Sequence, residues 1–186
     1  TSLEAAAIAP DGKTLVTKQD FSLRVRDLAT GEERRKIDLP RAKGSYHQNE
    51  CLLFTPDGKS IAVTSQGKVV HLIDFESGKP IRDFSPNNPE SSLPASFQTV
   101  LGLAFSADGK LLASGSVDRT VRLWDMNSLT EKVKLREHIG AVRGIAFRPD
   151  GRTLITASED MTVRLWDVLP GPTVRERSVL KGLVDP

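Results

Sequence analysis

The hexamer TVRLWD stands at Thr120–Asp125 and again at Thr162–Asp167, so it is either a site used twice or part of a structural unit built more than once. In both copies apolar and polar residues alternate, which is typical of a half-buried β-strand. An Asp-Gly pair precedes each copy, at residues 108–109 and 150–151, and this pair is a strong signal for a β-hairpin. The hexamer is therefore interpreted as one strand of a repeated unit.

The same frame occurs four times. Further Asp-Gly pairs at residues 11–12 and 57–58 give spacings of 46, 51 and 42 residues between the four turns, the period of an array of supersecondary units. In each unit an apolar run, the Asp-Gly turn, a second run, a tight polar turn, a third run and a charged fourth run follow one another. This order predicts an all-β protein with four antiparallel strands per unit, sixteen strands in all. Radial packing of such sheets would leave only short edges exposed.

With these repeats the sequence resembles the WD-repeat (WD40) β-propeller family. The resemblance rests on the Asp-Gly turn, the S/T-x-x-x-D turn and the closing x-W-D, and it is strong in the last two units and degenerate in the first two. It implies β-propeller blades made of four four-stranded antiparallel sheets. We expect one domain over residues 1–186, with blades at approximately 3–39, 48–84, 98–135 and 139–180.

In this family a structural hydrogen-bond network joins four residues of a blade, and the resemblance implies the same network here. The fourth unit has the full set by position: His138, Thr156, Asp160 and Trp166. The third unit has the partial set Ser114, Asp118 and Trp124, with Ser96 where the histidine would stand. The first unit has Arg26 at the tryptophan position, and the second has Gly67 and Ile73 at the aspartate and tryptophan positions. We expect the fourth blade to be the most rigid and the second the least.

Propellers of this family usually close with seven or eight blades, and this chain holds four. Apolar residues are expected to be exposed on the outer faces of the first and last blades, namely Leu15, Val16, Leu23, Val25, Leu154, Ile155, Val163 and Leu165. Large exposed apolar faces are rare in stable monomers. Three solutions remain open: a homodimer closing an eight-bladed ring, a fragment of a longer propeller, or four blades closing alone. The homodimer is preferred.

Few residues suggest chemistry. His138 has the structural role given above, and His71 is interpreted as an ordinary strand residue where the other units have arginine. His47 and Cys51 could form a nucleophilic pair, but Cys51 opens the apolar run CLLF, and a buried inert cysteine is the preferred interpretation. No two His or Cys residues have the spacing of metal ligands on one element. We expect no catalytic residue, no metal site and no cofactor.

Charge does not point to a polyanion. The 26 Lys and Arg residues balance 24 Asp and Glu residues, so neither nucleic acid nor a membrane is expected as a partner. The basic stretch Arg34–Lys43 could bind an acidic partner, but its interleaved acidic residues favour an outer edge strand protected by charge. The single cysteine favours an intracellular setting, and we expect a cytoplasmic protein.

The segment FSPNNPESSLPASF, residues 84–97, is the most unusual part of the sequence. Its prolines, asparagines and serines predict a polar loop between the second and third blades. In propellers of this family the face that carries such connections commonly binds partners. The expected partner-binding face comprises loop residues and second-turn residues: Asn87, Asn88, Glu90, Arg41, Lys43, Gln19, Gln66, Val117 and Glu159. The alternative is that residues 86–97 are a tolerated insertion.

These observations favour a non-catalytic protein–protein interaction scaffold built from WD repeats. A regulatory or sensor fragment of a larger multidomain protein is the first alternative. A propeller enzyme with polar residues at a central channel is the second, and the scarcity of histidine argues against it.

Overall fold

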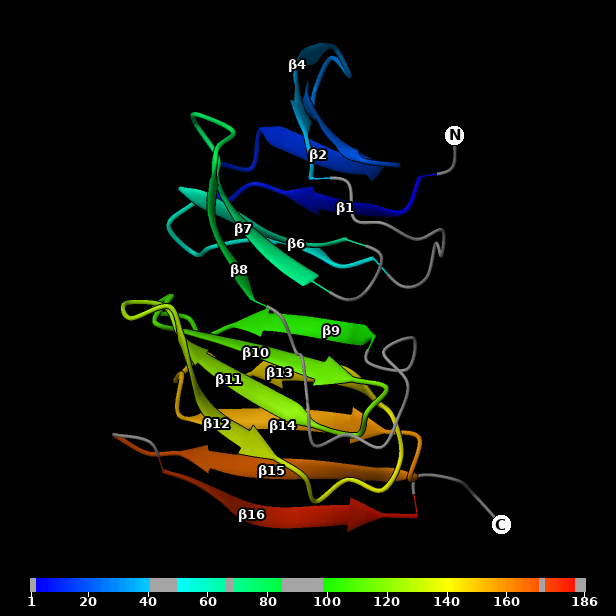
Figure 1. The fold of residues 1–186 in the computed structure, drawn as a ribbon, viewed down its shortest axis with the longest axis vertical. Helices are drawn as coiled ribbons and strands as arrows, with labels where there is room; N and C mark the ends of the chain where they lie inside the picture. The colour runs from blue at the N-terminus through cyan, green and yellow to red at the C-terminus, as the bar shows by residue number, and fades with distance from the viewer. Residues whose placement is uncertain (1–2, 41–49, 66–68, 85–98, 171–172, 183–186) are drawn as a thin grey trace. The chain divides into compact units, whose positions relative to one another are not determined.

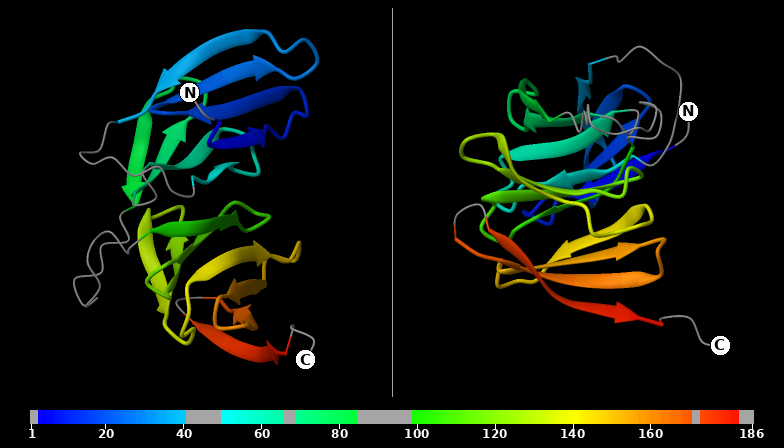
Figure 2. Two further views of the ribbon diagram at one scale, coloured as in Figure 1. Left: turned by 90° about the vertical axis from the view of Figure 1, so that its right-hand side faces the viewer. Right: turned by 60° about the horizontal axis from the view of Figure 1, so that its bottom comes forward.

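A computed structural model describes residues 3–40, 50–65, 69–84, 99–170 and 173–182. These residues form sixteen strands in four separate four-stranded antiparallel sheets, and they contain no helix (Figure 1). Within each sheet the strands follow chain order and are twisted (Figure 2). The predicted all-β class with four four-stranded sheets is confirmed. No helix in these ranges is long and apolar enough to cross a membrane.

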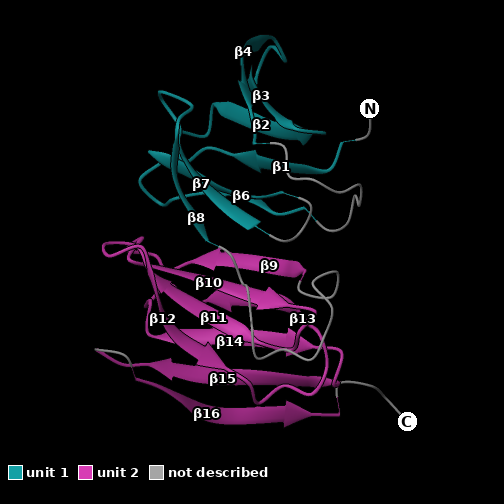
Figure 3. Ribbon diagram, viewed as in Figure 1, with its two compact units in different colours: residues 1–85 teal, residues 86–186 magenta. Residues whose placement is uncertain are grey.

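The chain divides into two compact units, residues 1–85 and 86–186 (Figure 3). The first unit holds two sheets. Their strands are β1 (Ala5–Ile8), β2 (Thr14–Gln19), β3 (Ser22–Asp27) and β4 (Glu33–Asp38), then β5 (Leu52–Phe54), β6 (Ser60–Ser65), β7 (Val69–Asp74) and β8 (Pro80–Phe84). One apolar core joins them, to which Val16, Leu23, Ile61 and Ile73 contribute.

The second unit also holds two sheets. Their strands are β9 (Val100–Phe105), β10 (Leu111–Ser116), β11 (Val121–Asp125) and β12 (Thr130–Leu135), then β13 (Val142–Phe147), β14 (Thr153–Ser158), β15 (Thr162–Val168) and β16 (Val174–Lys181). A second core lies between them. Leu123 and Val121 of the third sheet pack there against Leu154 and Trp166 of the fourth. Both copies of TVRLWD fall on the third strand of a sheet, as the alternation predicts, with Thr120 directly before β11 and Thr162 at the start of β15.

The four Asp-Gly pairs form the first hairpin turn of each sheet. Every glycine has a positive φ, between 66° and 72°, where a residue without Cβ is favoured. The preceding aspartate instead accepts a hydrogen bond from the backbone N–H two residues further on. Asp11 accepts from Lys13 at 2.7 Å and Asp150 accepts from Arg152 at 2.8 Å. The two letters of the pair thus have different tasks in the turn.

A β-bulge recurs between the third and fourth strands of all four sheets. In the last two sheets it falls directly before the tryptophan, between Leu123 and Trp124 and between Leu165 and Trp166. In the first two it falls before Arg26 and before Ile73. The bulge position shows that the degenerate units keep the backbone of the regular ones.

The prediction that all eight apolar residues of the outer faces are exposed is wrong for half of them. Val16, Leu23 and Leu154 are completely buried and Val25 is buried too. The reason is the alternation of faces along a strand: Val16 pairs with Val25 on the side that packs against the second sheet.

On the outer side of the last sheet the apolar residues are partly exposed, which is closer to the prediction. Ile155 pairs with Leu165 there, Val163 lies on the same side, and all three are only half-buried. On the outer side of the first sheet Leu15 pairs with Arg26 instead. The two outer sides therefore differ: one is apolar and the other carries arginine.

Candidate functional site

Four polar side chains of the last sheet form a continuous hydrogen-bonded chain. Trp166 Nε1 donates to Thr156 Oγ1 at 2.9 Å, and His138 Nε2 lies 2.8 Å from the same oxygen. His138 Nδ1 lies 2.7 Å from Asp160 Oδ2. Indole N–H only donates and an ionised carboxylate only accepts. A neutral imidazole with its proton on Nδ1 therefore satisfies every member, since the threonine hydroxyl then donates to Nε2.

Because the network is buried, losing one of its hydrogen bonds should lower the free energy of unfolding. The side chains of His138 and Asp160 are each 1% exposed, and Trp166 is 1% exposed. Burial by itself would raise the pKa of Asp160, but hydrogen bonds from the Thr162 hydroxyl and from His138 outweigh it and hold the pKa well below the ordinary value of 3.8. The carboxylate therefore stays ionised and available as an acceptor at neutral pH.

The third sheet has only part of this arrangement. Trp124 Nε1 donates to Ser114 Oγ at 3.3 Å, a longer contact than the one in the last sheet. Asp118 Oδ1 accepts from the Thr120 hydroxyl at 2.6 Å. Asp118 Oδ2 has no hydrogen-bond partner within the ranges that the structure describes, and Arg122 Nη2 lies 3.9 Å away. Ser96, expected at the histidine position, lies outside the described residues.

The first sheet replaces the network by an ionic one. Lys18 is 2% exposed, and its Nζ lies 2.5 Å from Glu4 Oε2 and 3.5 Å from Glu50 Oε1. The Glu50 carboxylate also accepts from the Thr64 hydroxyl at 2.8 Å, which ties the first two sheets together. Sequence reasoning missed this cluster because lysine is almost never fully buried unless it is paired.

Cys51, the candidate nucleophile, does not have the lowered pKa of a reactive thiol. Burial, with a smaller contribution from the Glu50 charge, raises the pKa of Cys51 to about 11. Its thiol is therefore protonated at neutral pH, whereas nucleophilic cysteines need a lowered pKa. His47 lies outside the described residues. No group of three potential metal ligands occurs in the described part of the chain.

Six residues of the expected partner-binding face lie outside the described residues: Arg41, Lys43, Gln66, Asn87, Asn88 and Glu90. Gln19 ends β2 in the first unit and is half-buried. In the second unit Val117 and Glu159 occupy equivalent turns, since their N–H groups donate to Thr99 O at 2.8 Å and to Ala141 O at 2.9 Å. The structure thus places these two at the same position of two sheets.

Two exposed apolar residues lie beside the hydrogen-bonded chain of the last sheet. Ile139 is 76% exposed and Met161 is 68% exposed. They line a shallow cavity of about 330 Å3 together with Asp160 and Arg164. Met161 holds a φ of 63°, unusual for a residue with a long side chain. The signal that sequence reasoning missed is a large apolar residue in a tight turn that is otherwise polar.

The basic stretch is mostly engaged within its own unit. Arg34 pairs with Asp27, and Lys36 pairs with Asp38 at 2.7 Å. Arg35 donates to the backbone carbonyls of Phe75 and Glu76, and its guanidinium lies 4.7 Å from the ring centroid of Phe75. These contacts assign residues 34–38 to the strand β4 and to its attachment to the second sheet, while Arg41 and Lys43 lie outside the described residues.

Comparison with known proteins adds the family. The model of the WD domain, G-beta repeat, matches residues 83–125 and 129–167. Over 87 residues, 44% of this chain, the sequence is 33% identical to WD repeat-containing protein 82 of Drosophila melanogaster, and it covers 25% of that protein. It is 37% identical to the U3 snoRNP-associated protein-like YAOH of Oryza sativa subsp. japonica over 48% of this chain and 18% of that protein. It is 29% identical to the COMPASS component SWD1 of Saccharomyces cerevisiae over 47% and 19%.

The chain thus spans a quarter or less of the length of these curated relatives. Their names also correct one expectation. The prediction of a cytoplasmic protein is contradicted, because COMPASS components and U3 snoRNP-associated proteins belong to nuclear and nucleolar complexes. The cysteine count on which that prediction rested indicates only a reducing compartment and does not distinguish the cytoplasm from the nucleus.

The repeat matches fall on the second unit, where TVRLWD and the tryptophan hydrogen bonds occur, while the first unit keeps the same four-stranded sheets and bulges with other residues. Residues 83–125 and 129–167 thus carry two WD40 repeats, and the four four-stranded sheets are consistent with propeller blades, of which the last two are closest to the pattern of that family.

Proposed function

We propose that this protein is a non-catalytic scaffold that holds protein partners, with Ile139 and Met161 at the centre of one binding surface. The observation that carries the proposal is the exposure of these two side chains, 76% and 68%, next to the buried chain from Trp166 to Asp160. Exposed apolar residues on a rigid base are what protein interfaces use as anchors.

Charged groups surround the two apolar residues. Glu159 Oε1 lies 2.6 Å from Arg143 Nε at the same edge of the sheet, and both side chains are about half exposed. An apolar centre with a polar rim is the usual anatomy of an interface. Among the relatives, those named as components of COMPASS are members of an assembly, which supports the same role for this chain.

The enzymatic alternative has no specific support. The best candidate residues have other roles: His138 is held between Thr156 and Asp160, and the Cys51 thiol has a raised pKa. We therefore propose that the chain is not an enzyme.

The proposal is tested by comparing the interaction partners of two matched variants in cells. Ile139→Ser with Met161→Asn removes both apolar anchors, and asparagine tolerates the positive φ of position 161. Leu28→Ser, at an exposed turn of the first unit, is the control. We expect the double variant to lose partners that the control retains. An unchanged set of partners at equal folded protein level would disprove the binding surface.

The outer sides of the first and last sheets need a cover, and we propose that other blades provide it. The preferred arrangement is a homodimer closing an eight-bladed ring, which would place Ile155, Val163 and Leu165 against the side that carries Leu15 and Arg26. Arg26 stands where Trp166 stands in the last sheet, so this junction would be more polar than the one between the last two sheets. A longer propeller with further blades is the alternative.

Light scattering coupled to size exclusion separates the arrangements. A mass of about twice the 20.3 kDa of the chain is expected for the homodimer. A monomer that exposes its outer apolar side, seen as strong binding of a hydrophobic dye, would favour further blades instead. A monomer that binds no dye would indicate that four blades close alone.

A further inference from the structure

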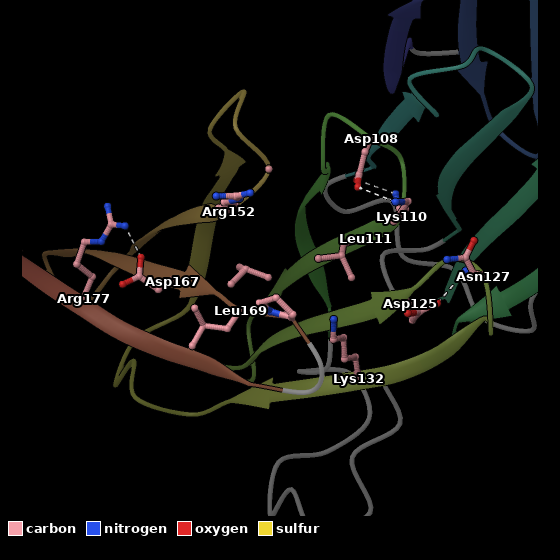
Figure 4. A pocket seen from close by; sticks show the side chains of 13 residues that line it. Asp108, Lys110, Leu111, Asp125, Asn127, Lys132, Arg152, Asp167, Leu169 and Arg177 are labelled. Atoms are coloured by element: carbon pink, nitrogen blue, oxygen red, sulfur yellow. Dashed lines mark hydrogen bonds and ion pairs between the residues drawn. The ribbon is translucent and has the colours of Figure 1, made fainter.

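A groove crosses the second unit at one end of its strands, opposite to the end where Ile139 and Met161 lie. It encloses about 650 Å3 and is lined by the first and last hairpin turns of the third and fourth sheets, at residues 108–111, 125–127, 151–152 and 167–170 (Figure 4). In an antiparallel sheet of four strands the first and third turns lie at one edge and the second turn at the other. This hairpin groove is therefore separate from the surface proposed above, which lies at the edge of the second turn.

The groove is lined by four cations: Lys110, Lys132, Arg152 and Arg177. Figure 4 shows Lys132, Arg152 and Arg177 coming from different strands and turns around it. Three carboxylates, of Asp108, Asp125 and Asp167, also line it. Whether the site attracts an anion depends on how many of these charges are already paired.

The carboxylates are engaged by the turns themselves. Asp108 accepts from the Ser106 hydroxyl at 2.7 Å and from a backbone N–H at 3.1 Å. Asp125 accepts from two backbone N–H groups at 2.9 and 3.0 Å. Asp167 is paired with Arg177. A hydrogen bond from the Ser106 hydroxyl holds the pKa of Asp108 below the ordinary value, and backbone N–H groups do the same for Asp125. Both carboxylates are therefore ionised and already accept hydrogen bonds within their turns.

Two of the cations have no such partner. Within the described ranges, neither the Lys132 ammonium nor the Arg152 guanidinium makes a hydrogen bond or an ion pair, and Lys132 is half-buried. The charge of Lys132 helps to lower the pKa of Asp125 without a direct contact, and an incoming carboxylate would give this half-buried ammonium a hydrogen-bonded partner. The unpaired charge of the groove is therefore positive.

The base of the groove is apolar. Leu111 and Val168 are nearly buried there, and Leu169 is 37% exposed. The lining contains no aromatic side chain on which a nucleic-acid base could stack. A peptide that carries both carboxylates and aliphatic side chains matches the cations and the apolar base together.

We propose that the hairpin groove binds an acidic segment of a protein partner, with its carboxylates on Lys132 and Arg152 and an aliphatic side chain on Leu169. This is a second docking surface, independent of the one at Ile139 and Met161. Because both sheets belong to one unit, the groove exists whether or not the ring is closed by a second copy.

The test uses the full chain and a short fluorescein-labelled peptide in which Asp and Glu alternate with Leu and Val. A peptide with Asn and Gln at the acidic positions is the first control, and a single-stranded oligonucleotide of similar charge is the second. Lys132→Glu with Arg152→Glu reverses the two unpaired charges. Lys13→Glu with Lys79→Glu, at two exposed residues of the first unit, reverses the same number of charges and is the matched control.

Anisotropy titrations at low salt are expected to show saturable binding of the acidic peptide only. The Lys132→Glu, Arg152→Glu variant should weaken it about tenfold or more, while Lys13→Glu with Lys79→Glu stays within about twofold. Lys132→Gln with Arg152→Gln gives a second, milder pair if the reversed charges reduce the folded fraction. Equal affinity of the amide peptide, tighter binding of the oligonucleotide, equal loss in both variants, or no saturable binding of the acidic peptide would each overturn the proposal. None of these results bears on the Ile139–Met161 surface, so the two proposals fail separately.

Discussion

His71 Nδ1 lies 2.6 Å from Asp83 Oδ1, and this pair takes the place of an arginine–glutamate pair that joins the third and fourth strands of every other sheet. Arg164 reaches diagonally to Glu176, which is in register with Trp166. The shorter imidazole contacts the residue directly opposite, since His71 and Asp83 are in register. All four sheets therefore keep at least one polar side-chain contact between their third and fourth strands.

We expect this outer contact to contribute little to stability in the last sheet. Glu176 is one-third exposed, and Glu176→Gln should lower the free energy of unfolding by less than about 1 kcal/mol. Urea denaturation at moderate salt measures the change. A larger loss would mean that the ion pair, rather than backbone pairing, holds β16 in place.

Replacing Trp166 should be far more costly. Trp166→Ala removes a large side chain that is 1% exposed and should lower the free energy of unfolding by roughly 3–5 kcal/mol. Trp166→Phe keeps an aromatic ring but loses the N–H that donates to Thr156, and about 1–2 kcal/mol of the loss should remain. Denaturation of the second unit, followed by tryptophan fluorescence of Trp124, measures both. A loss below about 1 kcal/mol for the alanine variant would contradict the buried network.

Acid should weaken the last sheet through Asp160. Its pKa in the folded protein lies below the ordinary 3.8, so its contribution is complete above the pKa of the unfolded chain and declines as the pH falls below about 4. Asp160→Asn cannot change its charge. The variant should be less stable than the wild type at pH 7 and should lose less on going to pH 3. Melting curves at several pH values test this, and parallel pH profiles of the two proteins would refute it.

The buried ionic cluster of the first unit predicts a non-additive series. Lys18→Met removes the ammonium that lies near the buried carboxylates of both Glu4 and Glu50, and should cost about 3–5 kcal/mol. Adding Glu4→Gln and Glu50→Gln removes both charges and should restore a substantial part of that loss. Chemical denaturation of the single and triple variants makes the comparison. Equal losses would show that the methylene packing of Lys18, and not its charge, is what matters.

Gly140 is a position where a single methyl group should matter. A Cβ there would lie 2.5 Å from the backbone N of Asp160 and 2.8 Å from the carbonyl carbon of Glu159. Gly140→Ala should therefore push the residues after His138 away from that turn and cost roughly 1–3 kcal/mol. A Cβ at Gly151 meets nothing, so Gly151→Ala isolates the cost of a positive φ alone, expected at about 1 kcal/mol. A smaller effect at Gly140 than at Gly151 would contradict the close approach.

Local signals explain what could be predicted from the sequence. The Asp-Gly turns and the alternation in TVRLWD act over a few residues, so the sheets and their turns could be derived from the chain alone. The burial of Lys18 could not, because it depends on Glu50, which is distant in sequence and precedes the first strand of another sheet. The exposure of Ile139 likewise follows from its place at the edge of the sheet, which no local pattern encodes.

Most side chains of the TVRLWD strand in the last sheet make a specific polar contact. Thr162 donates to Asp160 at 2.6 Å, Arg164 pairs with Glu176, Trp166 donates to Thr156, and Asp167 pairs with Arg177. The network partners of these residues, His138 included, all lie within 24 positions along the chain. A single stretch of coding sequence therefore carries a complete blade with all of its internal bonds. Gene duplication can add such a segment without any matching change elsewhere, because the contacts that hold the blade together lie within it.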